Sequence, residues 1–348
     1  MKFRTLTGLV LLALCIFITG CQSSKPVAGD VSKNIIICLP GDATPVESLA
    51  ASELSLHLKT VLKIDVPIVH VSDQSTSFDG TVFPFYIGFV PPETASPPPG
   101  HGGYRVTDTE GYFYGNDVMA VRENLKSVVR ALHPDGRPGT AFALYQYLEK
   151  DCGVRWPEPK TIFYPTELAS GFPAGSGEFV PLEKGQWVEA SREAEAASPL
   201  PNGIRATLAL DSVRGGVRQL HNNLWMKRLR LSLLPNVERS NVMFDAWCPG
   251  SAQALYGTMA ALTEAPARNL LLKGRLLDWG LAGLMRYTLA QGLATGFEDD
   301  FEDFAEDYFR SFGPAKNDVR SYFQEWKDVY ERAAAANRLY FEGLPGII

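Results

Sequence analysis

The sequence predicts an α/β protein: a small α/β sandwich domain followed by a region in which strands give way to helices. Three observations support this fold class. Strand and helix patterns alternate early in the chain, and helical periodicity dominates after Ser251. The chain has 348 residues, 45% of them hydrophobic, which suffices for two packed domains.

The first domain opens with a strand–helix–strand pattern. The continuous apolar run Asn34–Pro40 indicates a strand buried on both faces. Apolar residues then recur at helical spacing between Val46 and Leu62. A second strand is expected at Asp65–Val71, so the three elements form a βαβ unit.

The rest of the first domain alternates in the same way. Phe83–Phe89 is expected to be a strand, and Tyr104–Val106 with Gly111–Tyr114 a hairpin. Pro138–Lys150 has one apolar helical face, and the chain returns in a strand near Thr161–Tyr164.

A stretch rich in Gly, Ser and Pro, Ala169–Glu178, marks the predicted domain boundary. Beyond it, strands are expected at Trp187–Arg192 and Asn241–Trp247, and a helix at His221–Leu233. The segments Arg268–Leu293, Phe297–Phe312 and Asn317–Asn337 are expected to be helices. The predicted organisation is a signal peptide (1–20), a tether (21–32), the α/β domain (33–168), a strand-containing region (169–250) and a helical C-terminal region (251–342).

The N-terminus has the layout of an export signal. Two basic residues precede the apolar run Leu6–Gly20, which is shorter than the roughly 20 residues of a membrane-spanning helix. Ile18-Thr-Gly-Cys21 places small residues before a cysteine, which predicts cleavage and lipidation at Cys21. The alternative is an ordinary signal peptide with a coincidental cysteine.

Lipidation places the protein in the cell envelope, with the membrane as a partner through the lipid anchor. Gln22 after the cysteine favours the outer membrane or cell surface. The net charge of −6 and the lack of a basic stripe argue against nucleic acid as a partner.

The cysteines and motifs point to no cofactor and no metal. Cys38, Cys152 and Cys248 are too few and too widely spaced for a disulfide framework or a zinc site, which leaves a single Cys38–Cys152 bridge open. The chain has no phosphate loop, no Gly-x-Ser-x-Gly and no His-Glu-x-x-His motif.

Several motifs resemble a known family. They are Ala51-x-Glu-Leu-x-x-x-Leu58, Tyr86-Ile-Gly88, Gly139-Thr-x-x-Ala-x-Tyr-x-x-Leu-Glu149, Gly153-Val-Arg-Trp156 and Tyr164-Pro165. Together they resemble the N-terminal domain of family-67-type α-glucuronidases, which also precedes the barrel in proteins of the domain-of-unknown-function 4838 group. Trp187-x-x-x-x-Arg192, Asn223–Arg228 and Phe304–Ala315 are similar to that group's first barrel strand, first barrel helix and terminal helices.

The resemblance implies a (β/α) barrel that this chain cannot complete. A full barrel takes about 250 residues, and only roughly 75 lie between Gln186 and Ala261. We therefore expect an incomplete (β/α) barrel remnant followed by C-terminal helices, as a shortened paralogue or as the product of an internal deletion.

Glycoside hydrolysis needs two carboxyl groups at a barrel's strand ends. Glu189 and Glu193 near the first strand, Asp211, and Asp245 are the catalytic candidates. Trp247 beside Asp245 suits a sugar face, although a strand end with a core aromatic has the same pattern.

Three polar residues are further substrate-binding candidates. His221 and Asn222 can point into a cleft or cap a helix, and Arg192 ends the stretch that resembles the first barrel strand. Two loops allow alternatives. Glu298–Asp303 can hold a cation or complement a helix dipole, and Arg137–Thr140 can bind an anion or pack the module.

The function predicted from these features is that of a surface-anchored, carbohydrate-related lipoprotein of the α-glucuronidase-like lineage with incomplete catalytic machinery. Its expected partner is a polysaccharide or oligosaccharide. Two alternatives stay open: an active O-glycosyl hydrolase using paired carboxylates, and a non-catalytic glycan-binding scaffold.

Overall fold

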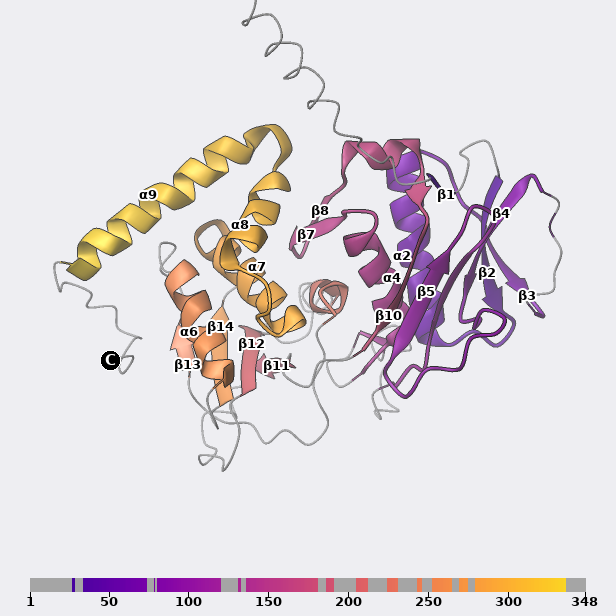
Figure 1. The fold of residues 1–348 in the computed structure, drawn as a ribbon, viewed down its shortest axis with the longest axis horizontal. Coiled ribbons are helices and arrows are strands. Elements are labelled where there is room, and N and C mark those ends of the chain that lie inside the picture. The colour runs from indigo at the N-terminus through magenta and orange to yellow at the C-terminus, as the bar shows by residue number, and fades with distance from the viewer. Residues whose placement is uncertain are drawn as a thin grey trace, which may run out of the picture.

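The computed structural model describes residues 27–28, 34–73, 78, 80–119, 131–132, 136–180, 186–190, 205–211, 224–230, 243–245, 252–264, 269–274 and 279–335. These residues form a mixed α/β fold with a six-stranded sheet at one side and four helices over a smaller sheet at the other (Figure 1). None of the helices within these ranges is both long and apolar enough to cross a membrane.

The larger sheet contains the βαβ unit that the sequence predicts. Its strands follow the order β10-β5-β6-β4-β2-β3, and β2 is parallel to both β3 and β4. The hairpin β5–β6 and the pair β10–β5 are antiparallel, so the sheet is mixed. The bounds are β2 Asn34–Pro40, β3 Ile68–Val71, β4 Val82–Ile87, β5 Gly102–Val106, β6 Gly111–Gly115 and β10 Gly175–Phe179.

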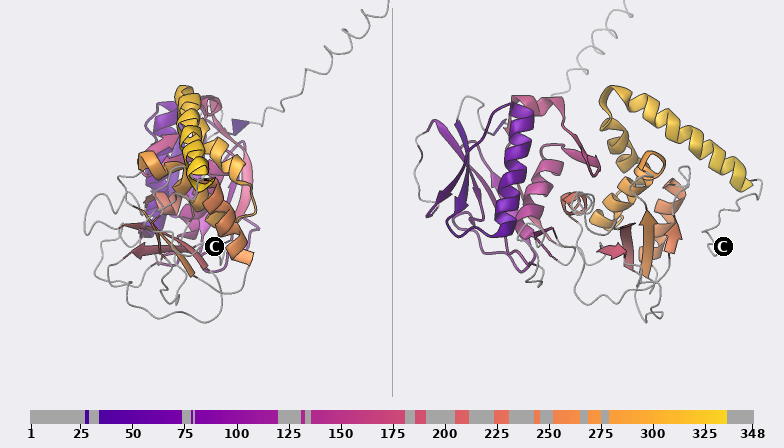
Figure 2. Two further views of the ribbon diagram at one scale, coloured as in Figure 1. Left: turned by 90° about the vertical axis from the view of Figure 1, so that its left-hand side faces the viewer. Right: turned by 180° about the vertical axis from the view of Figure 1, so that it is seen from behind.

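Two helices, α2 (Pro45–Leu62) and α4 (Gly139–Lys150), pack against each other beside this sheet, on the side that faces the rest of the molecule (Figures 1 and 2). A capping box between Thr44 and Glu47 starts α2. All residues of α4 except Lys150 are buried, so α4 lies at the centre of the protein.

Three glycines let α4 approach the ends of β5 and β6. A Cβ atom on Gly139 would lie 2.1 Å from the carbonyl oxygen of His101, and one on Gly115 would lie 2.2 Å from the backbone nitrogen of Thr140. A Cβ atom on Gly102 would likewise lie 2.2 Å from the carbonyl oxygen of Gly139. The backbones therefore meet where a side chain has no room.

Gly139→Ala is expected to lower the free energy of unfolding by at least about 2 kcal/mol, because the backbone of His101 must move to admit the methyl group. Gly41→Ala is the matched control, since nothing lies within 4 Å of a Cβ atom there. Urea denaturation of both variants measures the difference, and equal stabilities would contradict the close packing.

The stretch Ala169–Glu178, expected to mark a domain boundary, contains strands. Phe172–Pro173 (β9) pairs with Val27–Ala28 (β1), and Gly175–Phe179 is β10, an edge strand of the larger sheet. Gly177 faces the ring of Tyr104, where a Cβ atom would lie 2.8 Å away. The glycines of this stretch therefore allow the strand to pack closely against its neighbours.

A hairpin links the two halves of the molecule. It consists of β7 (Arg155–Glu158) and β8 (Thr161–Phe163), and it is followed by the short 3-10 helix η1 (Thr166–Ser170). In Figure 1 this hairpin lies between the sheet half and the helical half. Only β8 was expected as a strand near this position.

The second sheet has four parallel strands in the order β11-β12-β14-β13. Their bounds are β11 Gln186–Ala190, β12 Arg205–Asp211, β13 Met243–Asp245 and β14 Asn269–Gly274. The helices of this half are α6 Ala252–Glu264, α7 Trp279–Thr295, α8 Phe301–Arg310 and α9 Lys316–Ala335.

Two expectations need correction. The segment Arg268–Leu293, predicted as one helix, is the strand β14 followed by the helix α7, so the chain beyond Ser251 is not helical throughout. A bridge between Cys38 and Cys152 is excluded, because neither cysteine forms a disulfide and both are buried. Burial raises the pKa of the Cys38 thiol to about 11, as expected of a cysteine that acts as a small hydrophobic residue.

Candidate functional site

The carboxyl ends of the second sheet hold three of the acidic residues singled out by the sequence. Glu189 lies one residue before the end of β11, while Asp211 and Asp245 end β12 and β13. Because the strands are parallel, these backbone positions lie along one edge of the sheet. This is the edge at which parallel α/β proteins carry their catalytic groups.

The strand order sets the distances between these catalytic candidates. β11 and β13 are the two outer strands, so the backbone positions of Glu189 and Asp245 are three strand spacings apart, about 14 Å in a flat sheet. Asp211 is two spacings from Asp245 and two residues further along the sheet, or about 12 Å away. Glu189 and Asp211 lie on neighbouring strands, one residue out of register, or about 6 Å apart. Glycosidases place their carboxyl groups roughly 5–10 Å apart. Among these positions, Glu189 and Asp211 come within that range.

The other candidates lie outside the described residues. They are Cys21, Arg192, Glu193, His221, Asn222 and Trp247.

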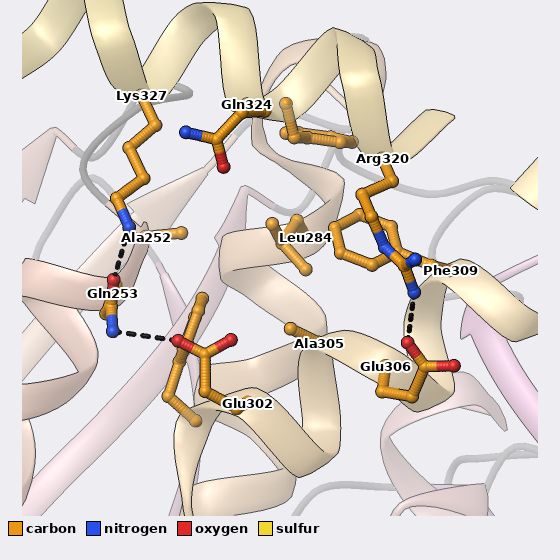
Figure 3. A pocket seen from close by; sticks show the side chains of 12 residues that line it. Ala252, Gln253, Leu284, Glu302, Ala305, Glu306, Phe309, Arg320, Gln324 and Lys327 are labelled. Carbon is orange, nitrogen blue, oxygen red and sulfur yellow. Dashed lines mark hydrogen bonds and ion pairs between the residues drawn. The ribbon is translucent and has the colours of Figure 1, made fainter. Parts of the chain in front are cut away.

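A pocket of about 440 Å³ opens among the four helices of the second half (Figure 3). Its floor is apolar and includes the buried side chains of Leu284, Ala305, Phe309 and Phe323, with Phe301 beside them. The amphipathic pattern of α8 and α9 explains this floor, because both helices turn their phenylalanines inward.

Polar side chains frame the floor on two sides (Figure 3). On one side, Lys327 Nζ donates to Gln253 Oε1 at 2.9 Å, and Gln253 Nε2 donates to Glu302 Oε1 at 2.9 Å. On the other side, Glu306 accepts hydrogen bonds from Arg320 and Lys316. The rim therefore offers donors and acceptors around an aromatic surface.

The rim is electrically balanced. Glu302 and Glu306 contribute two negative charges, and Arg320 and Lys327 two positive charges. The hydrogen bond from Lys316, with the nearby Arg320 cation, holds the pKa of Glu306 below its ordinary value, so this carboxylate is ionised near neutral pH. A neutral, amphipathic ligand fits this charge balance better than an ion does.

Sequence reasoning missed this pocket, because its residues come from four separate helices, and periodicity does not show how those helices pack together. The helical periodicity predicted α8 and α9 and their apolar faces, but that pattern is typical of any packed helix pair. Glu302 and Asp303 of the acidic run lie in the first turn of α8, in keeping with the dipole interpretation. Within the described ranges, no group of three or more His, Cys, Asp or Glu residues could hold a metal ion.

Two of the stretches that carry the family resemblance meet in a buried ion pair. Arg228, from the helical segment 224–228, donates through Nε to Glu53 Oε2 at 2.9 Å and through NH2 to Oε1 at 3.2 Å. Tyr145 donates to the same carboxylate at 3.3 Å. Both charged side chains are more than 90% buried. This bidentate ion pair holds the segment 224–228 against α2 and α4.

His57 lies one helical turn from Glu53 and is fully buried. Its Nδ1 atom is 2.9 Å from the hydroxyl of Tyr164, and its ring packs edge-on against Trp156. Burial and the Arg228 cation lower the pKa of His57 to about 3. The imidazole is therefore neutral at physiological pH and helps to pack the junction.

A second buried cluster joins α4 to the helical half. Arg230 forms an ion pair with Glu149, and Gln291 Nε2 donates to Glu149 Oε1 at 2.7 Å. Burial alone would raise the pKa of Glu149, but Arg230 and Arg155 hold it below its ordinary value. Arg155 Nε also donates to Asp307 at 2.8 Å, so Arg155 packs the two halves together.

A smaller cavity of about 370 Å³ lies next to this cluster, bounded by Arg155, Pro165, Glu167, Asp307 and Arg310 among others. Its two arginines already form ion pairs with Asp307. It lacks the aromatic floor of the helical pocket, which is the better candidate for a ligand site.

The anion site considered at Arg137–Thr140 is filled by the protein itself. Asp117 accepts a hydrogen bond from the Thr140 backbone nitrogen at 2.8 Å and one from the Thr140 hydroxyl at 3.0 Å. This carboxylate caps α4 in place of a bound anion. Burial raises its pKa to about 6, although both hydrogen bonds act in the opposite direction.

Comparison of the chain with models of protein families, with curated proteins and with solved structures gave no match.

Proposed function

We propose that this chain is a non-catalytic carbohydrate-binding lipoprotein of the cell envelope, and that the pocket among α6, α7, α8 and α9 holds the sugar. The observation that carries the proposal is the pocket's aromatic floor inside a charge-balanced polar rim. Its volume of about 440 Å³ is within the range of small-molecule sites, roughly 300–1,000 Å³.

The pocket suits the surface chemistry of a saccharide. A pyranose ring presents apolar C–H groups on its faces and hydroxyl groups around its edge. Phe309 and Phe323 supply an apolar surface for the ring face. The amide of Gln253 and the carboxylates of Glu302 and Glu306 supply partners for the hydroxyl groups.

The lipid anchor and the barrel lineage are parts of the same proposal. The pattern ahead of Cys21 supports attachment to the envelope, where polymeric glycans are met. The four parallel strands and the meeting of Glu53 with Arg228 support descent from a (β/α) barrel protein with an α-glucuronidase-type first domain. Strand β14, inserted between β12 and β13, departs from the sequential strand order of such a barrel.

One observation favours a second candidate, an active glycosidase. The backbone positions of Glu189 and Asp211 lie on neighbouring strands, one residue out of register, within the distance found between catalytic carboxyl groups. In that case Asp211→Asn would abolish sugar release. A wild-type chain that binds without releasing sugar favours the non-catalytic function.

The test uses the chain from Gln22 onward, incubated with a library of plant and algal glycans and with insoluble polysaccharides. We expect retention on at least one polysaccharide without release of sugar. The double variant Gln253→Ala/Lys327→Ala, which removes one side of the rim, should lower the affinity at least about tenfold by deleting hydrogen-bonding partners.

The matched control is Lys63→Ala, an exposed lysine on the other half of the molecule, which should bind as the wild type does. Two results would overturn the proposal: sugar release by the wild type, or no retention on any glycan. Equal binding by the double variant would exclude the pocket as the site.

A further inference from the structure

The helix α9 carries an apolar stripe that faces away from the pocket. Val319, Tyr322, Trp326 and Val329 follow one another at spacings of three, four and three residues. This is the spacing of the a and d positions in a coiled coil. The last three are exposed by 38%, 37% and 45%, unusually high for large apolar side chains on one helix face.

The stripe and the pocket use different sides of α9. Phe323 and Lys327, which line the pocket, are on average about 100° further round the helix than Tyr322 and Trp326. Phe323 is buried, whereas Trp326 is exposed. In Figures 1 and 2, α9 runs along the outer edge of the molecule, where a second helix can reach it. Val319 packs against the core, but Tyr322, Trp326 and Val329 serve neither the core nor the proposed sugar site.

Charges beside the stripe indicate what could cover it. Glu325 and Arg332 are both exposed and lie seven residues apart, on the same flank of the stripe. In an antiparallel pair of helices, residues on the same flank of the two copies face each other. A two-fold axis between Trp326 and Val329 then places Glu325 of each copy opposite Arg332 of the other. Parallel pairing would bring Glu325 near Tyr330 and form no ion pair.

We infer that α9 is the contact surface for a second copy of this chain, packed antiparallel through Tyr322, Trp326 and Val329 and aligned by two Glu325–Arg332 pairs. Tyrosine and tryptophan are the side chains that most often carry the binding energy of such contacts. The stripe and its flanking charges span about two heptads, which is fewer than a stable isolated coiled coil needs. The dimer is therefore weak and concentration-dependent. Anchoring in a membrane would raise the local concentration and favour it.

The experiment is sedimentation equilibrium of the chain from Gln22 onward over a series of concentrations. The wild type is expected to show a monomer–dimer equilibrium. Trp326→Ser should weaken dimerisation at least about tenfold, since it removes the central aromatic contact. Its far-ultraviolet circular dichroism and thermal midpoint check that the exposed substitution leaves the fold intact.

Charge reversal tests the orientation. Glu325→Arg and Arg332→Glu should each weaken the dimer by placing like charges together, and the double variant Glu325→Arg/Arg332→Glu should restore it. A wild type that stays monomeric at every concentration would overturn the inference. A dimer that Trp326→Ser leaves intact, or that the double reversal does not restore, would also overturn it. Measured without any glycan, the result is independent of the proposed sugar binding.

Discussion

Arg228→Met is expected to lower the free energy of unfolding by about 3–5 kcal/mol, because it leaves the buried carboxylate of Glu53 without its cation. Both charges of this pair lie in the protein interior, where neither can be solvated. Among the residues that the structure describes, Tyr145 would remain as a donor to the carboxylate. Chemical denaturation monitored by tryptophan fluorescence measures the change.

Two comparisons show whether burial causes this effect. Lys59→Met removes an ion pair to Asp65 that is exposed on both sides, and should change the stability by less than about 1 kcal/mol. Glu53→Leu/Arg228→Met replaces both buried charges, so it should be more stable than Arg228→Met alone. Equal losses for the Lys59 and Arg228 variants would contradict the buried pair.

The second large effect is a dependence of stability on pH caused by His57. In the folded protein the pKa of His57 is lowered to about 3, compared with 6.5 for the free side chain. As the pH falls from 6.5 towards 3, the unfolded chain gains a proton at His57 that the folded protein does not accept. Stability is therefore lost across this window, with a total on the order of 5 kcal/mol.

The measurement is the free energy of unfolding of wild type and His57→Gln between pH 7 and pH 5. Asp117, whose pKa is raised to about 6, contributes in the opposite direction, since the folded protein holds that proton more tightly as the pH falls. This contribution is common to both proteins and cancels in their difference. His57→Gln should flatten the fall in stability, and His70→Gln, at an exposed histidine, should not. Identical slopes for the wild type and His57→Gln would rule out a buried neutral imidazole.

Much of the first sheet could be predicted from the sequence. The strand at Asn34–Pro40 has the predicted bounds, and α2 begins one residue before the predicted start. Here the local signals agree with the fold. The strand is an apolar run before a turn, and the helix α2 begins with a capping box. The helix ends at Lys63, whose backbone adopts the left-handed conformation typical of helix ends. Where local preference and tertiary packing favour the same structure, the periodicity of apolar residues is sufficient to predict the helices and strands.

The errors occurred where a pattern has two physical explanations. Strand β14 contains the short apolar run Leu270–Leu272, and such a run fits a buried helix as well as a strand between parallel neighbours. The glycines of Ala169–Glu178 suggested a domain boundary, and in the structure Gly177 allows an edge strand to approach Tyr104. In both examples the alternatives are distinguished by the neighbouring strands, which the sequence does not reveal.

The candidate site was less accessible to sequence reasoning. Carboxylates at strand ends were predicted, but the distance between them depends on strand order, and β14 separates β13 from β12. The helical pocket was missed because Gln253 and Lys327 meet only through the packing of α6 against its neighbours. At Arg137–Thr140, the glycine and the helix start suited an anion, but the residue that fills this position, Asp117, is 23 residues away.

The buried ion pairs between the halves have a consequence for folding. Glu53 and Arg228 are 175 residues apart, and Arg155 and Asp307 are 152 apart. Long loops must close before these contacts form, which makes folding slow. A fragment ending after Phe179 would keep Glu53 and Glu149 but lose their cationic partners Arg228 and Arg230. The larger sheet is therefore not an autonomous folding unit, and both halves should unfold in one cooperative transition.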